Sequence, residues 1–140
     1  NGKAQIGTIK DGAGHTITLT SSSNRLSKVT DPEGRVTQYM YSTSSTTVTS
    51  GGAPGAGYLT QIKYPDGKSS YYAYDSDGAL TKVTAKDGKG LAFTYTTEAK
   101  GKRVNKVVEF GTDGSTGQTI AFSRNNVKCG FSTHFPPIKY

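Results

Sequence analysis

The sequence contains few side chains whose types and spacing suit catalysis or metal binding. Its two histidines, His15 and His134, lie far apart, and its single cysteine, Cys129, has no partners at the spacing of a zinc site. The segment Asp75-Ser76-Asp77-Gly78 has the opening residues of a calcium loop but lacks the later ligands, including the glutamate at the twelfth position. No glycine-rich phosphate loop with a Lys-Ser or Lys-Thr ending is present. The sequence therefore predicts a protein that is not an enzyme and that holds no cofactor or metal.

Two rows of side chains are candidates for binding, and the first is aromatic. It consists of Tyr39, Tyr41, Tyr72, Tyr74 and Tyr95, together with Phe93. Because residues i and i+2 share a face of a sheet, stacked hairpins would place these rings in a ladder. The rings would form a thin core, each burying ~150–250 Å², or they would present a flat platform to the faces of a carbohydrate. Both interpretations are open.

The second candidate row is basic. It consists of Lys28, Lys63, Lys82, Lys106 and Arg103. The formal net charge of +7 and the pI near 9.5 favour contact with anionic surfaces or polymers. The row would provide solubility and protect strand edges, or it would bind an acidic polysaccharide or an anionic cell surface. Nucleic acid is not an expected partner, because no recognised reader motif accompanies the charge.

The elements that must position both rows are five repeated hairpin units. Each unit starts with two apolar residues three positions apart, at Ile6/Ile9, Leu26/Val29, Leu59/Ile62, Leu80/Val83 and Val104/Val107. A turn glycine follows each start, at Gly12, Gly34, Gly67, Gly88 and Gly114. An apolar or aromatic pair two positions apart then follows the turn, at Ile17/Leu19, Tyr39/Tyr41, Tyr72/Tyr74, Phe93/Tyr95 and Ile120/Phe122. A repeat of about 20 residues predicts units that bury their apolar faces only by stacking on their neighbours.

Composition sets the limits of this organisation. A chain of 140 residues with 18 glycines, nine tyrosines and only 32% hydrophobic residues favours an extended all-β protein with a thin core. We expect five hairpin repeats over residues 1–122, with a loop insertion at about 42–57 whose glycine-rich part holds no strand, and an irregular tail or cap over 123–140. No apolar run reaches the roughly 18 residues that cross a bilayer. The start at Asn1, without Met or a signal-peptide pattern, indicates a processed chain or part of a longer one.

The repeat resembles a known family. Residues Tyr72 to Thr84 follow the pattern Tyr-x-Tyr-Asp-x-x-Gly-x-Leu-Thr-x-Val-Thr and are similar to the YD repeat of RHS proteins, teneurins and the shell components of insecticidal toxin complexes. Residues Arg25 to Tyr41 match the same pattern, and the resemblance covers about residues 1–122. It implies consecutive antiparallel hairpins in a curved or solenoid-like sheet, which in the family closes a hollow shell around a toxin or forms a barrel in a cell-surface protein. The family's self-cleaving aspartate site has no matching motif here.

Two functions from different classes follow as expectations. The first is a non-catalytic structural segment of a secreted or cell-surface RHS-like protein, contributing to a β-sheet shell or scaffold. In isolation, such a strip would self-associate through its open edges into a filament, or pair with neighbouring repeats of a larger chain. The alternative is an adhesive module that recognises acidic glycans through the tyrosine and lysine rows.

Overall fold

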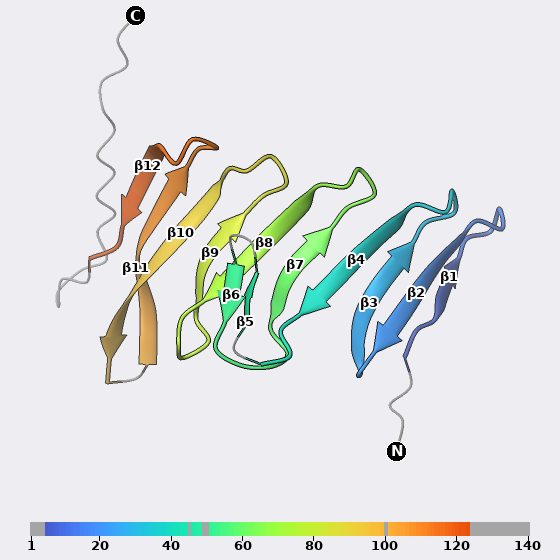
Figure 1. Cartoon of the computed structure of the whole chain (residues 1–140), viewed down its shortest axis with the longest axis horizontal. Coiled ribbons are helices and arrows are strands. Elements are labelled where there is room, and N and C mark those ends of the chain that lie inside the picture. Colours follow the sequence, from blue (N-terminus) through green and yellow to red (C-terminus); the bar gives the residue numbers. More distant parts are fainter. Residues whose placement is uncertain (1–4, 45, 49–50, 100, 124–140) are drawn as a thin grey trace, which may run out of the picture.

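The computed structural model describes residues 5–44, 46–48, 51–99 and 101–123, and these residues form strands and turns without a helix (Figure 1). The strands are β1 (Thr8–Lys10), β2 (Thr16–Ser22), β3 (Arg25–Thr30), β4 (Val36–Tyr41), β5 (Thr46–Val48), β6 (Gly51–Ala53), β7 (Leu59–Lys63), β8 (Ser69–Tyr74), β9 (Leu80–Thr84), β10 (Gly90–Glu98), β11 (Gly101–Phe110) and β12 (Thr116–Ala121). The expected all-β class is confirmed. The predicted tail over 123–140 lies, apart from Ser123, outside the described residues.

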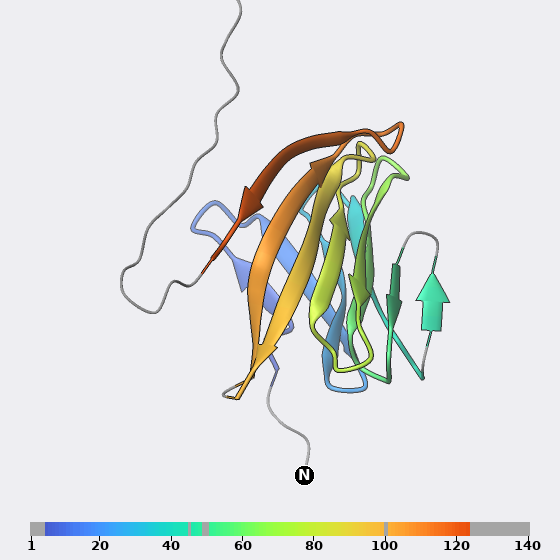
Figure 2. The ribbon, with the colours of Figure 1, turned by 90° about the vertical axis from the view of Figure 1, so that its left-hand side faces the viewer.

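Ten of the twelve strands follow one path through a single sheet, and along it chain order is spatial order. The path runs β1-β2-β3-β4-β7-β8-β9-β10-β11-β12, and every neighbouring pair along it is antiparallel. Figure 2 shows the sheet from its C-terminal end, where successive strands turn relative to one another, as the right-handed twist of β-strands requires. Consecutive hairpins in one curved sheet are therefore the architecture, as the repeat predicted.

The insertion between β4 and β7 contains a small hairpin. Strands β5 and β6 pair with each other, and Gly52 of β6 also forms a parallel bridge with Ala73 of β8. The expectation that the glycine-rich part of this segment holds no strand is therefore wrong. Glycine is a poor strand residue, but pairing on both sides of β6 outweighs that weak preference.

The base of the insertion is closed by Ser42. Its backbone N–H donates to the Tyr58 carbonyl at 2.9 Å, and its carbonyl accepts from the Gly57 N–H at 2.7 Å. Its hydroxyl donates to the Gly55 carbonyl and accepts from the Tyr58 N–H. These bonds let β4 and β7 pair as though the insertion were absent.

Six tight turns share one backbone geometry. In each, the first residue's N–H donates to the carbonyl of the fifth, and the glycine at the fourth position donates to the carbonyl of the first. The six glycines, Gly14, Gly34, Gly67, Gly78, Gly88 and Gly114, have φ between 78° and 93°, which favours glycine. In the first unit the structure thus places the positive φ on Gly14, two residues after the glycine that the sequence suggested.

One extra residue interrupts four strand pairs at corresponding places. These β-bulge residues are Ser27, Thr60, Thr81 and Asn105. Three of them donate their hydroxyls to the preceding strand, from Ser27 to Thr20 O (3.0 Å), from Thr60 to Met40 O (3.3 Å) and from Thr81 to Ala73 O (3.1 Å). The position after the first apolar residue of a unit therefore satisfies a backbone carbonyl where the ladder is broken.

In the second to fifth units, the bulge explains why the unit starts with two apolar residues three positions apart. In a regular strand such residues would point to opposite faces. In β7, Leu59 pairs directly with Tyr41 and Ile62 pairs with Tyr39, because Thr60 is the extra residue. Since Tyr39 and Tyr41 share a face, Leu59 and Ile62 share it as well.

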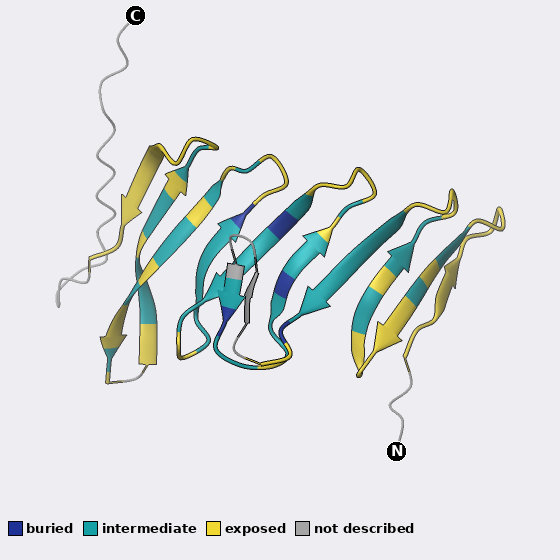
Figure 3. Cartoon of the chain, viewed as in Figure 1, coloured by how far each residue is buried: buried dark blue, intermediate teal, exposed yellow. Residues whose placement is uncertain are grey.

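The sheet has a single layer, so its core is thin. Among the described residues, Ala53 is the one hydrophobic residue that is buried, whereas Ile6, Ile9, Leu91, Ile120 and Phe122 are exposed. Figure 3 shows the exposed residues concentrated in the turns and at the two ends of the sheet, with partly buried residues along its middle. The low hydrophobic content of the sequence predicted such a core.

Candidate functional site

The predicted aromatic row lies on one face of the sheet, which we name the aromatic face and define by Tyr39, Tyr41, Tyr72, Tyr74, Phe93 and Tyr95. Directly opposite residues of antiparallel strands share a face. Tyr39, Tyr72 and Phe93 stand opposite Ile62, Val83 and Val107. Every member of the row is partly buried by these neighbours.

Two phenol hydroxyls of this row bond to the backbone of a neighbouring strand. Tyr74 donates to the Leu59 carbonyl at 2.9 Å, and Tyr95 donates to the Leu80 carbonyl at 2.7 Å, one repeat further along. The Tyr74 ring also packs against Tyr58, with ring centroids 4.9 Å apart. Burial, followed by the neighbouring phenols, raises the pKa of both Tyr72 and Tyr74. These are the contacts of a packing core, and they occupy hydroxyls that a sugar would otherwise meet.

The lysines of the predicted basic row lie on the opposite face, which we name the basic face and define by Lys28, Lys63, Lys82 and Lys106. Lys28 and Lys63 stand opposite Gln38, which neighbours Tyr39 in β4 and therefore points the other way. Lys82 stands opposite Ala73 and Ala92, and Lys106 stands opposite Thr94. The two rows therefore cannot act on one ligand from the same side.

Two of the predicted cations are already engaged within the protein. The Lys82 ammonium lies 4.4 Å from the centroid of the Phe110 ring, a cation–π contact. Arg103 forms an ion pair with Glu98, with 2.8 Å between Nη2 and Oε1. By contrast, Lys28, Lys63 and Lys106 are exposed and form no ion pair with the described residues.

A groove opens where the β3–β4 turn meets the β7–β8 turn. It is an open depression of about 510 Å³, lined by Gly34, Arg35, Val36, Gln38, Lys63, Tyr64, Pro65 and Gly67. A second hollow of about 550 Å³ shares Arg35, Tyr64 and Pro65 with it and reaches Lys86 of the next turn. Sequence reasoning found Lys63 but missed Arg35, Gln38 and Tyr64, because nothing in their local pattern shows that the two turns meet.

The charges around Tyr64 are largely paired. Arg35 contacts Asp31 at 2.6 Å and Glu33 at 2.5 Å. Lys86 contacts Asp66 at 3.3 Å, and its ammonium lies 5.5 Å from the centroid of the Tyr64 ring. The Arg35 guanidinium lowers the pKa of Asp31, chiefly through its hydrogen bond.

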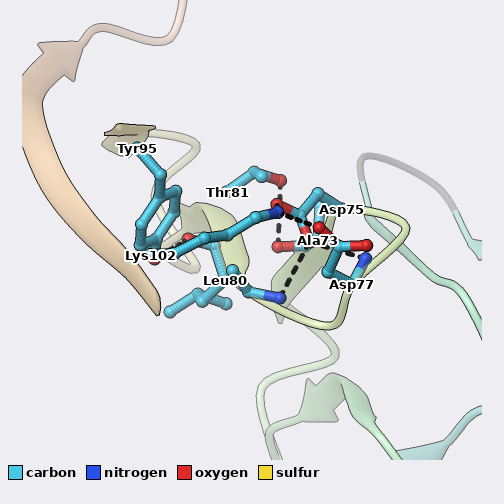
Figure 4. Close-up of polar contacts among 8 residues, drawn as sticks. Ala73, Asp75, Asp77, Leu80, Thr81, Tyr95 and Lys102 are labelled. Atoms are coloured by element: carbon cyan, nitrogen blue, oxygen red, sulfur yellow. Dashed lines mark hydrogen bonds and ion pairs between the residues drawn. The ribbon is translucent and has the colours of Figure 1, made fainter. Parts of the chain in front are cut away.

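A second cluster joins strand β11 to the β8–β9 turn (Figure 4). Lys102 extends past Tyr95 and Leu80, and its ammonium lies 2.6 Å from Oδ2 of Asp75 and 2.5 Å from Oδ2 of Asp77. Oδ1 of Asp75 meanwhile accepts the N–H groups of Asp77 and Ala79. The apparent start of a calcium loop is therefore a turn whose two carboxylates share one ammonium group of the same chain.

The Lys102 cluster predicts a dependence of stability on pH at both ends of the scale. The hydrogen bond with Lys102 lowers the pKa of Asp75, and the bonds with Asp75 and Asp77 raise that of Lys102. Stability from the lowered carboxyl is present above the unfolded pKa of about 3.9 and is lost as pH falls through the folded value. Stability from the raised ammonium is present below its unfolded pKa of about 10.4 and is lost as pH rises through the folded value.

We expect Lys102→Met to lower the urea midpoint at neutral pH and to flatten its change between about pH 2 and pH 5. Urea unfolding monitored by circular dichroism at a series of pH values measures both effects. Lys89→Met is the matched control, since Lys89 is exposed and forms no ion pair with the described residues. Identical pH profiles for Lys102→Met and the unmodified chain would contradict the coupling.

Metal-ligating groups do not cluster in the described part of the chain: no set of three or more His, Cys, Asp or Glu residues is placed to hold a metal ion. His15 contacts Asp11 at 2.8 Å within the first turn. Cys129 and His134 lie outside the described residues. A search of the described residues also finds no helix with the length and apolar character to cross a membrane.

Comparison with solved structures supports the architecture. No protein-family model and no curated protein matches the sequence. A chain in the structure of the Tc holotoxin pore of Photorhabdus luminescens, determined with a mutated TccC3, matches with a TM-score of 0.56 at 14% sequence identity. The match covers 81% of this chain and 5% of that chain, so this protein spans only a small part of its length. The protein is thus similar in fold to part of a chain of a toxin complex.

Proposed function

We propose that this protein is a non-catalytic structural segment of a secreted or cell-surface RHS-like protein, in which its YD-like hairpins form part of a β-sheet shell or scaffold. The observation that carries the proposal is the single-layer sheet whose end strands, β1 and β12, each pair on one side only within the described residues. A one-layer strip of this kind is suited to being continued by further hairpins. The fold similarity to a chain of a toxin complex and the YD-like repeat both support it.

The direction of the end strands allows the sheet to continue without changing its pattern. The path contains ten strands that alternate in direction, so β1 and β12 run opposite ways. A further array of the same kind can therefore pair with either edge antiparallel while its aromatic face stays on the same side. Ile9 of β1 and Ile120 of β12 are exposed at the two edges of the sheet. Both lie on the aromatic face, because they stand opposite Ile17 and Val107. The purified chain would then add to copies of itself and form filaments.

The isolated chain is expected to show masses above the monomer that grow with concentration, and elongated particles in negative-stain images. Light scattering across a concentration series measures the masses. Ile9→Lys/Ile120→Lys puts charge on the aromatic side of both edges and should restore the monomer. Thr8→Lys/Thr119→Lys adds the same charges to the same strands on the other face, and should assemble more than the isoleucine double variant does. A monomer at every concentration would contradict self-assembly.

The glycan-binding alternative is not favoured at the aromatic row. Tyr74 and Tyr95 use their hydroxyls on backbone carbonyls of the sheet, and the rings are partly covered. The basic face instead offers exposed, unpaired cations. An adhesive role for this protein would therefore use lysines rather than tyrosines.

A further inference from the structure

Five side chains on the basic face lie in one line across the sheet. They are Thr20, Lys28, Gln38, Lys63 and Ser69, each the direct cross-strand partner of the next. At the usual strand spacing of 4.7–4.9 Å, the backbones of Lys28 and Lys63 lie about 10 Å apart. The pairing of β4 with β7 creates this line, because those strands are separated in sequence by the insertion.

The line ends beside the groove between the two turns. Gln38 and Lys63 belong to both features, and the groove adds Pro65 as an apolar wall. The Tyr64 side chain lies on the aromatic face, because its hydroxyl is 3.2 Å from that of Ser70, which stands opposite Ile62. Within the described residues, the Gln38 side chain and the Lys63 ammonium form no hydrogen bond or ion pair. Their donors are therefore available to a ligand, whereas Arg35 and Lys86 are held by carboxylates.

This arrangement differs from a general excess of surface charge. Two unpaired ammonium groups flank one amide, on strands that the ladder keeps at a fixed spacing. A proline, Pro65, stands at one end of the line, as in sites where an apolar wall and a few polar groups orient a ligand. The acidic residues nearby, Asp31, Glu33 and Asp66, are paired with Arg35 and Lys86 and not with the two lysines of the line.

We propose that the line from Lys28 through Gln38 to Lys63, with the groove beside it, binds a linear anionic polysaccharide that crosses the strands. Carboxylate or sulfate groups of successive sugars would accept from Lys28 and Lys63, and a sugar hydroxyl would bond to Gln38. One sugar ring would rest against Pro65. A single-stranded nucleic acid fits less well, because its bases stack on a series of aromatic rings and this line of side chains contains none. This role is separate from the structural function proposed above and does not depend on it.

The test measures binding of fluorescently labelled heparin and polygalacturonate oligosaccharides by polarisation, with neutral dextran and single-stranded DNA as comparison ligands. Lys28→Gln/Lys63→Gln is expected to weaken binding of both acidic oligosaccharides about tenfold, which corresponds to about 1.4 kcal/mol. The double variant Lys10→Gln/Lys106→Gln removes the same charge from exposed residues of the same face. It should change binding by less than about twofold, since long-range attraction is screened by salt.

Each outcome decides for or against this site. Equal weakening by the two double variants would show a diffuse charge effect and overturn it. Binding of dextran at the strength of heparin, or of DNA more tightly than both acidic oligosaccharides, would also overturn it. Binding of heparin without polygalacturonate would retain the site and assign it to sulfated sugars. Circular dichroism and light scattering on the same samples separate lost binding from lost folding or altered assembly.

Discussion

Gly90→Ala is expected to destabilise the protein by about 1–3 kcal/mol, the usual cost of forcing extra volume into a packed site. A Cβ atom at this position would overlap the Val83 carbonyl oxygen and would lie 2.6 Å from Cζ of Phe110. Val83 belongs to the paired backbone of β9, so it cannot move aside without disturbing the ladder. Chemical denaturation, with the midpoint followed by circular dichroism, measures the change.

The reason for a glycine at position 90 is the aromatic side chain opposite it. Phe110 stands directly across from Gly90, and its ring approaches the Lys82 ammonium on the far side of β10. An aromatic ring that covers a strand glycine is a known stabilising arrangement of sheets. The substitution would therefore disturb the packing of three strands at once.

Gly12→Ala is the matched control for Gly90→Ala. No heavy atom lies within 4 Å of the Cβ that it would add, and its φ is not in the left-handed region. Replacing glycine at a compatible position stabilises a protein by about 0.4–1 kcal/mol through the unfolded chain. The two substitutions should thus change stability in opposite directions. Equal stability of Gly90→Ala and the unmodified chain would refute the packing account.

Tyr74→Ala is expected to cost about 2–4 kcal/mol, less than the 3–5 kcal/mol typical of a fully buried aromatic residue because the ring is only partly buried. The substitution removes the hydrogen bond to Leu59 and the ring contact with Tyr58, and each such contact contributes about 0.5–1.5 kcal/mol. Tyr74 also lies in β8, in the middle of the sheet, with paired strands on both sides. The unfolding midpoint again measures the change.

Tyr74→Phe distinguishes the contribution of the hydroxyl to stability from that of the ring. It should cost about 1 kcal/mol, the typical contribution of one hydrogen bond, because the Leu59 carbonyl loses its donor. Tyr39→Phe is the control, since the Tyr39 hydroxyl forms no hydrogen bond with the described residues. If Tyr74→Ala proved no more harmful than Tyr74→Phe, the ring would not be part of the core.

The repeat was predictable because its signals are local. A strand, a turn with glycine at a fixed position and a second strand follow one another within about 20 residues. The tyrosine pairs, at i and i+2, must share a face whatever the neighbouring strands do. The all-β class, the consecutive hairpins and the aromatic face therefore follow from the order of residues along the chain.

Errors arose where a tertiary contact outweighs a local preference. Strand β6 forms in a glycine-rich segment because β5 and β8 pair with it. In the first turn both Gly12 and Gly14 were available, and the hydrogen bonds across the turn select Gly14. Neither strand β6 nor the positive φ at Gly14 can be predicted from composition alone.

The repeat, the order of the strands and the shared face of each tyrosine pair follow from the order of residues along the chain. Which residues of different units meet is a property of the folded sheet: Lys102 meets Asp75, Phe110 meets Gly90, and Lys28 and Lys63 stand on either side of Gln38. These contacts depend on the register between strands, which is set by a bulge residue in four of the five units and by an insertion closed at its base. A shift of one residue in that register would exchange the two faces and separate every one of these pairs.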